Sequence, residues 1–167
     1  MASSTLPPIS HILETCLYVK DVPAAAEFYK KALQIEPFSQ SDRGACFALG
    51  HTTLLLFKLG GTTTDLIVES RGIIPKHGPT ESNLLPSLLA EETSEGETKN
   101  SLRQHFCFAV PSPDDVGKWD AHFQELGVKI LGRMDWEKGG KSVYFEDLDG
   151  HVGEVGSRGV WAHYPLE

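Results

Sequence analysis

The chain has 167 residues, which is enough for one domain with a substantial hydrophobic core. Hydrophobic residues make up 40% and charged residues 23%, values close to globular averages that exclude collagen-like, coiled-coil and wholly disordered chains. The net charge of -8, without a run of basic residues, argues against nucleic acid as a partner.

The cysteines and the lack of a long apolar run predict the compartment. Cys16, Cys46 and Cys107 form an odd set without CxxC spacing, which excludes a disulfide framework and a thiolate zinc site. No apolar run approaches the roughly 20 residues of a membrane span, and the first ten residues do not resemble a signal peptide. We therefore expect a cytoplasmic protein with no membrane partner.

The first structural unit begins with a strand at residues 12–20. Apolar residues at its odd positions make one face, and Glu14 lies on the opposite face. Asp21 then offers an N-cap and Pro23 suits the first helical turn, so a helix of about three turns follows.

Three more strands complete this unit. Residues 43–49 and 52–58 are two predicted strands joined by the turn Gly50-His51. A weaker strand is predicted at residues 35–39. The first unit is therefore a β-α-β-β-β module.

The same order appears again about 90 residues later. It begins with a strand at 103–110, and Ser112 caps the following helix. The strands that complete the second module are predicted at residues 128–136, 141–146 and 151–156.

The two modules align as an internal repeat. Residues 14–19 match residues 105–110 with a cysteine and a valine in the same register, and Gly50-His51 matches Gly150-His151. In each module a helix covers one face of a small sheet. The open faces must then close on each other, within the chain or with a second chain. The predicted fold class is α+β, with two repeated βαβββ modules whose sheets close into a cupped, barrel-like cavity.

The chain outside the modules forms a linker and a tail of one overall domain. The stretch from Ala90 to Asn100 is acidic and has no aromatic residue, which is typical of a mobile loop. The predicted parts are a first module at 1–58, a linker and lid with this acidic insert at 59–102, a second module at 103–157 and a C-terminal tail at 158–167.

Three metal-competent side chains occupy equivalent places in the repeat: Glu14, His105 and Glu154. In period-2 phase each lies opposite the residues that face the helix, so each points into the predicted cavity. Two carboxylates and an imidazole suit Zn, Mn, Fe or Ni, and three protein ligands leave positions open for a substrate. The alternative is that the carboxylates are solvated and His105 is a hydrogen-bonded core histidine.

Leucine occupies the fourth symmetric position. Leu54 follows Gly50 by four residues, as Glu154 follows Gly150. Leucine cannot bind a metal ion, so we expect a three-ligand site with an apolar wall made by Leu54 and Leu56.

Two further residues are candidates for catalysis. His77 lies in the linker segment IPKHG, which we expect to gate the cavity with His77 as a mobile acid or base; the alternative is a solvated loop histidine. Tyr144 could reach the cavity as a hydrogen-bond donor, although a strand tyrosine is commonly packing.

The sequence resembles the vicinal oxygen chelate superfamily of glyoxalase, bleomycin resistance and dioxygenase-like proteins. The resemblance covers nearly the whole chain outside the insert. It rests on ILETCLYVKD with FYKKAL, LLLF at 54–57, IPKHG at 74–78 and WEKGGKSVYFEDLDGHVGEV at 136–155.

The resemblance implies a divalent metal ion held by Glu14, His105 and Glu154. Such an ion chelates adjacent oxygens of a small substrate and stabilises an oxyanion while a carboxylate, Glu14 or Glu154, moves a proton. We expect a metal-dependent enzyme, with lyase or isomerase chemistry favoured and dioxygenation possible, that forms a homodimer. The alternative is a non-catalytic protein of the bleomycin-resistance type that sequesters a small molecule.

Overall fold

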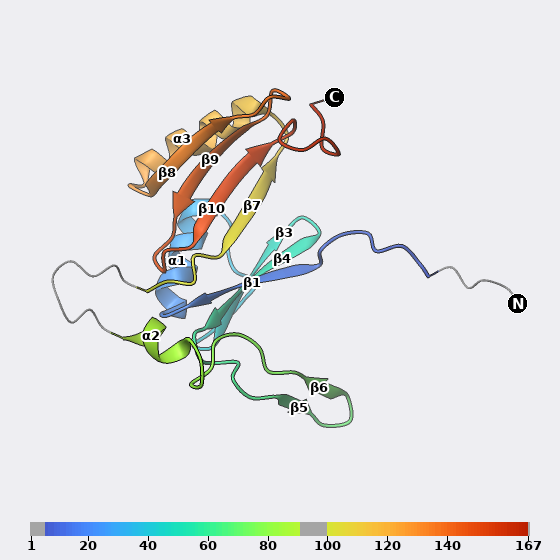
Figure 1. The fold of residues 1–167 in the computed structure, drawn as a ribbon, viewed down its shortest axis with the longest axis vertical. Helices are drawn as coiled ribbons and strands as arrows, with labels where there is room; N and C mark the ends of the chain where they lie inside the picture. The colour runs from blue at the N-terminus through green and yellow to red at the C-terminus, as the bar shows by residue number, and fades with distance from the viewer. Residues whose placement is uncertain (1–5, 91–99, 167) are drawn as a thin grey trace, which may run out of the picture.

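The computed structural model describes residues 6–90 and 100–166 (Figure 1). The acidic insert predicted as a mobile loop lies mostly outside the described residues. Among the described residues, no helix is long and apolar enough to cross a membrane.

The first module has the predicted order of elements, and its four strands form one sheet in the order β1-β4-β3-β2. β1 and β4 are parallel, and the other neighbours are antiparallel. The weak strand predicted at 35–39 instead lies at 39–41. The elements are β1 (Glu14–Val19), α1 (Val22–Leu33), β2 (Ser39–Ser41), β3 (Gly44–Leu49) and β4 (Thr52–Lys58).

The second module repeats this topology with the order β7-β10-β9-β8, again with a parallel pair, β7 and β10, at one edge. The prediction of two βαβββ modules in an α+β fold is confirmed. The elements are β7 (His105–Val110), α3 (Pro113–Glu125), β8 (Lys129–Asp135), β9 (Lys141–Glu146) and β10 (Val152–Ser157).

Both module helices begin at the predicted N-caps. The Asp21 carboxylate accepts a hydrogen bond of 2.9 Å from the Ala24 amide at the start of α1. The Ser112 hydroxyl accepts one of 3.3 Å from the Asp115 amide at the start of α3. These side chains satisfy amides that have no partner within the helix, so each helix begins at a defined residue.

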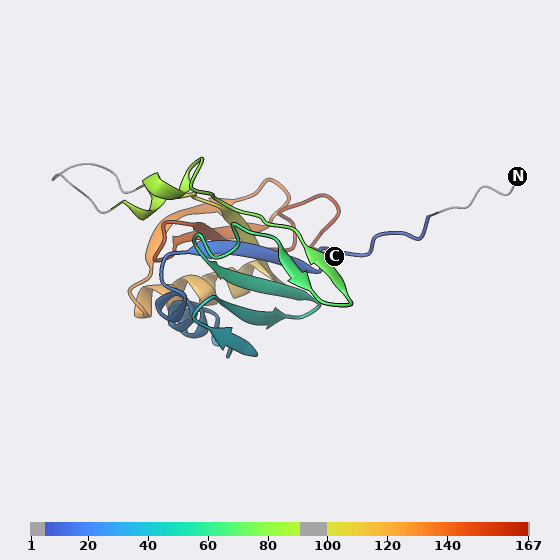
Figure 2. The same cartoon turned by 90° about the horizontal axis from the view of Figure 1, so that it is seen from below.

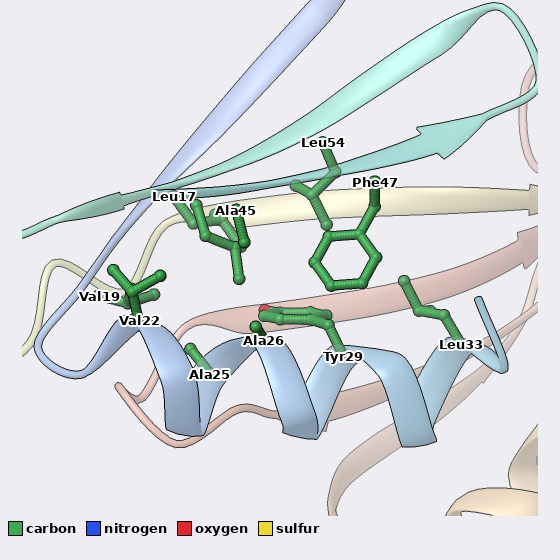
Figure 3. Packing of buried hydrophobic residues seen from close by; sticks show 11 residues of the cluster. Leu17, Val19, Val22, Ala25, Ala26, Tyr29, Leu33, Ala45, Phe47 and Leu54 are labelled. Atoms are coloured by element: carbon green, nitrogen blue, oxygen red, sulfur yellow. The ribbon is translucent and has the colours of Figure 1, made fainter. Parts of the chain in front are cut away.

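Each helix packs on one face of its own sheet. In the first module, Tyr29 of α1 lies against Phe47 and Leu54 of the sheet (Figure 3). In the second module, Phe123 of α3 packs on Phe145 with ring centroids 4.6 Å apart. Burial of these large apolar side chains is the main force that holds each helix on its sheet.

The two modules share a core on the helix side. Three aromatic side chains, Phe28 of α1 with Phe106 and Phe108 of β7, pack against both hydrophobic clusters. Ala32 of α1 belongs to the cluster of the second module. The helix α1 therefore contributes to both cores, and the modules associate through their helix sides.

Buried polar contacts also join the modules. The backbone amide of Gln104 donates a hydrogen bond to Nδ1 of His151. The ring hydrogen of His151 is therefore on Nε2, which donates to the Tyr18 carbonyl at 3.0 Å. The Tyr29 hydroxyl donates to the Asp147 carboxylate at 2.7 Å. His151 is 1% exposed and is a satisfied core histidine.

This packing leaves the open faces of the two sheets apart. The sheets are separate four-stranded units and do not close into one barrel within the chain. Of the two predicted ways of closing the open faces, closure with a second chain stays a prediction, whereas closure within the chain is wrong. The reason is that the shared aromatic residues bring the modules together on the helix side rather than through the open faces.

The linker forms an arm and a short helix. The arm is a two-stranded hairpin of β5 (Leu66–Val68) and β6 (Gly72–Ile74), which lies on the side of the first sheet away from α1 (Figure 2). The helix α2 (Leu85–Leu89) buries Leu85 and Leu88 in a third small cluster.

The strand register corrects the fourth symmetric position. In β10, Glu154 lies opposite the cysteine of β7, whereas in β4 the residue opposite the matching Cys16 is Leu55. Leu54 and Leu56 are fully buried under α1 and line no open face. The prediction that Leu54 and Leu56 form an apolar wall of the site is therefore wrong. The predicted position is off by one residue, and a shift by one residue exchanges the two faces of a strand.

Candidate functional site

His105 and Glu154 form a pair on the open face of the second sheet. Nε2 of His105 lies 3.2 Å from Oε2 of Glu154. The His105 side chain is 53% exposed, whereas that of Glu154 is 6% exposed. A carboxylate so deeply buried is costly unless a proton or a positive charge accompanies it.

The backbone fixes the tautomer of His105. Nδ1 lies 3.2 Å from the carbonyl oxygen of Val152, which can only accept, so Nδ1 carries a hydrogen. Nε2 therefore meets the Glu154 carboxylate with either a second proton or a cation between them. Nδ1 bonded to a carbonyl is also the usual arrangement for a histidine that binds a metal ion through Nε2.

The second oxygen of Glu154 is held from the neighbouring strand. The Ser142 hydroxyl donates to Oε1 of Glu154 at 2.5 Å and accepts from Nε1 of Trp136 at 2.9 Å. This chain of hydrogen bonds orients the carboxylate, so that Oε2 is the oxygen directed at His105. Ser142 and Trp136 were not predicted, although Ser142 is in phase with Tyr144 along β9.

Tyr144 and Cys107 lie beside the same carboxylate. Burial and then the charge of Glu154 raise the pKa of Tyr144, whose ring centroid is 6.1 Å from that of His105. The same two causes raise the pKa of Cys107 to about 12. Both side chains are therefore neutral near pH 7, Tyr144 as a possible donor and Cys107 as a thiol rather than a thiolate ligand.

We expect Cys107 to be chemically inert although it lies on an open face. With a pKa of about 12, only about one thiol in ten thousand is ionised at pH 8, so iodoacetamide should modify Cys107 more than about a hundredfold more slowly than free cysteine. Glu154→Gln should accelerate the reaction because it removes a negative charge that opposes ionisation. Peptide mass spectrometry in the presence of a chelator would measure the rate, with Glu146→Gln as control. An equal rate in both variants would contradict the assignment.

Glu14 lies on the open face of the other sheet. Its side chain is exposed. Burial raises the pKa values of Cys16 and Cys46, and the negative charge of Glu14 raises them further. Within one chain, the residues that the structure describes contain no group of three metal-binding side chains. The structure thus brings His105 and Glu154 together and leaves Glu14 on a separate face.

His77 is attached to the first sheet rather than free on a lid. Its Nδ1 forms a hydrogen bond with the Tyr18 hydroxyl, and its ring packs on Phe57 with centroids 5.2 Å apart. The Thr62 hydroxyl donates to the His77 carbonyl at 2.6 Å. Gly78 follows at φ 81°, where a Cβ would overlap the Tyr18 ring. These contacts hold His77 against the open face of the first sheet, and its role as an acid or base stays a prediction.

The pair His105–Glu154 fits one divalent ion. Two donors bound to the same ion at about 2.0–2.2 Å lie about 3.0–3.5 Å apart, which matches the separation of 3.2 Å between Nε2 and Oε2. Imidazole nitrogen and carboxylate oxygen suit Zn, Mn, Fe or Ni. The hydrogen bonds from Ser142 to Glu154 and from His105 to Val152 supply the outer contacts that such ligands need.

Comparison with known proteins identifies the superfamily and the fold. A model of the Glyoxalase/Bleomycin resistance protein/Dioxygenase superfamily matches residues 9–155. A crystal structure of lactoylglutathione lyase from Agrobacterium tumefaciens is 27% identical, with a TM-score of 0.72, and the match covers 93% of this chain and 99% of that chain.

A more distant structure shares the fold. The genomically encoded fosfomycin resistance protein of Listeria monocytogenes is 16% identical with a TM-score of 0.53, over 92% of this chain and 94% of that one. No curated protein sequence gives a significant match. Because the superfamily model matches most of its length, the chain belongs to the glyoxalase, bleomycin resistance protein and dioxygenase superfamily.

Proposed function

We propose that the protein is a divalent-metal-dependent enzyme that acts on a small oxygenated molecule. The observation that carries this proposal is the pair of His105 and the buried Glu154, whose facing nitrogen and oxygen atoms lie 3.2 Å apart. When bound, the ion would chelate adjacent substrate oxygens and stabilise negative charge on them.

The residues around the pair have separate roles in this proposal. His105 binds through Nε2, while Glu154 balances charge and can move a proton to or from the substrate. Ser142 keeps one oxygen of Glu154 occupied, which directs the other into the site. Tyr144, whose raised pKa keeps its hydroxyl protonated, can donate a hydrogen bond to a substrate oxygen.

Lyase or isomerase chemistry is the proposed reaction type. Proton transfer by a carboxylate next to an oxyanion is the step that such reactions need, and it requires no further reactant. The 27% identity with a protein named lactoylglutathione lyase supports the same class. Ring-cleaving dioxygenation is less favoured because it needs molecular oxygen and a redox-active metal in addition.

We further propose that Glu14 completes the site in a homodimer. Glu14 and His105 occupy matching positions in β1 and β7, and each lies on a face that its own chain leaves open. A two-fold dimer that places the first sheet of one copy against the second sheet of its partner would cover all four open faces and form two identical sites. Each site would then take Glu14 from one copy and the pair His105–Glu154 from the other.

Metal analysis of the purified protein tests this function. After incubation with zinc, manganese, iron(II) or nickel and removal of excess ion, elemental mass spectrometry should find about one ion per chain. Glu14→Ala should weaken binding by more than about tenfold, because one ligand is lost, while the melting temperature of the metal-free protein stays unchanged since Glu14 is exposed.

The matched control is Glu27→Ala, which removes an exposed carboxylate from α1. It should leave the metal content as in the parent protein. Full occupancy in Glu14→Ala would remove Glu14 from the site. A parent protein that takes up none of these ions would overturn the enzyme proposal.

Binding without catalysis is the second candidate function. The observation that favours it is an apolar cavity of about 360 Å³ on the open face of the first sheet, which none of the three proposed metal ligands lines. A protein of this second kind would hold small molecules equally well with and without metal ions.

A further inference from the structure

The cavity lies between the first sheet and the arm. Its walls are mostly apolar: Phe57 comes from β4, and Leu66 and Ile74 come from the arm. Leu66 and Ile74 are opposite each other in the hairpin and so share one face, while Ile67 and Ile73 share the other. The arm therefore turns one aliphatic pair toward the cavity and one away from it.

Two basic side chains line this cavity, Arg43 and His77, and no carboxylate does. One nitrogen of the Arg43 guanidinium donates to the Gly61 carbonyl at 3.1 Å. Its other side-chain N–H groups have no acceptor, and Arg43 has no ion-pair partner, among the residues the structure describes. In a chain of net charge -8, this is a local site of positive charge.

His77 adds a polar group to the cavity. Its Nδ1 is occupied by the Tyr18 hydroxyl, whereas its Nε2 has no hydrogen-bond partner within the described part of the chain. A ligand that enters the cavity can therefore meet a guanidinium that is hydrogen-bonded to Gly61 and an imidazole nitrogen.

We propose that this cavity binds a small organic carboxylate, with its apolar body between Phe57, Leu66 and Ile74 and its carboxylate at Arg43. A volume of about 360 Å³ is within the range of small-molecule sites. A guanidinium with free N–H groups suits a carboxylate, which it can bind with two parallel hydrogen bonds. Arg43 is the only arginine or lysine among the described residues that line the cavity, and one guanidinium balances the charge of one carboxylate.

The cavity also bears on the substrate of the proposed enzyme. Cys46 lines it, and the strand register places Cys46 opposite Leu55, which lies opposite Cys16, two residues from Glu14 and on the same face of β1. A molecule held at Arg43 thus extends along the face that carries Glu14. In this respect the inference rests on the proposed function and assigns it an apolar carboxylic acid as the substrate class.

Phenylacetate is a suitable probe, with 2-phenylethanol and 2-phenylethylamine as neutral and cationic analogues of similar size. Titration calorimetry or ligand-detected NMR in the presence of a chelator would measure binding without metal. Phenylacetate should bind more tightly than 2-phenylethanol, and 2-phenylethylamine should bind least. Equal binding of all three, or no binding of phenylacetate, would overturn the proposal.

Arg43→Gln should weaken phenylacetate binding by about tenfold or more and leave 2-phenylethanol unaffected, because a charged hydrogen-bond donor is lost. Arg71→Gln, which removes an arginine from the tip of the arm outside the cavity, is the matched control and should change neither affinity. The same loss in both variants would indicate general charge attraction and would contradict a built site.

The two faces of the arm give a second matched pair. Ile74→Ala should weaken the binding of both phenylacetate and 2-phenylethanol, since it removes an apolar wall. Ile73→Ala, on the opposite face of β6, should leave both unchanged. Equal losses in the two variants would overturn the placement of the ligand against this wall.

These results separate the inference from the proposed enzyme. Binding of phenylacetate by a protein that takes up no metal ion would sustain the cavity and refute the enzyme. Metal uptake without phenylacetate binding would refute the carboxylate site and sustain the proposed enzyme.

Discussion

Two variants that each bind metal poorly, Glu14→Ala and Glu154→Gln, are expected to regain metal binding when they are mixed. In a dimer whose sites span both copies, a mixed pair has one site in which both substitutions meet and one in which neither occurs. The intact site takes Glu14 from the Glu154→Gln copy, and the intact Glu154 from the Glu14→Ala copy. Random exchange of copies should therefore restore about one quarter of the sites.

The experiment starts from each variant alone, for which metal content after chelation should be low. Subunit exchange at low protein concentration, followed by concentration, metal loading and elemental mass spectrometry, gives the mixed sample. His105→Ala mixed with Glu154→Gln is the control, because those two residues form the 3.2 Å pair within one chain and mixing them yields no intact site. If the control recovers as much metal as the test mixture, or neither recovers, the shared site is excluded.

The largest expected effect on stability is at Asp147, which joins the modules. This carboxylate is 7% exposed and accepts the Tyr29 hydroxyl at 2.7 Å together with the backbone amides of Asp149 and His151. Asp147→Ala leaves these buried donors without an acceptor. The free energy of unfolding should fall by about 3 kcal/mol.

Tyr29→Phe is the matched variant for comparison. It removes the hydroxyl that donates to Asp147, while the two backbone amides that donate to the same carboxylate keep their acceptor. We expect a loss of about 1 kcal/mol. Urea denaturation of both single variants and the double variant would give the coupling between the side chains. A double variant that loses the sum of the single losses would show that the two groups do not interact.

The elements of each module could be predicted because their signals are local. The alternation in β1, the N-caps Asp21 and Ser112, and the turn between β3 and β4 each involve residues within a few positions of one another. The repeat added information that no single segment carries, since it placed His105 and Glu154 on one face of the second sheet before any contact was known.

The fourth symmetric position was predicted at Leu54 instead of Leu55 for a specific reason. The glycine-histidine pairs of the two modules are alike in sequence, but they join strands at different offsets. Thr53 of β4 is opposite Glu14, three residues after Gly50, whereas Val152 of β10 is opposite His105, two residues after Gly150. Counting from the turns therefore misplaced the position by one residue, and hydrogen bonds to the neighbouring strand decide such a register.

The sequence alone determined the two modules, the faces of their strands and the pairing of an imidazole with a carboxylate in the second module, because these follow from short-range periodicity and from the repeat. Only the tertiary structure decided how the modules meet. That depends on side chains distant in sequence, such as Phe28 and Phe106, which pack against the cores of both modules on the helix side. The same non-local packing leaves Glu14 apart from His105 and positions the arm over the first sheet to form the cavity at Arg43.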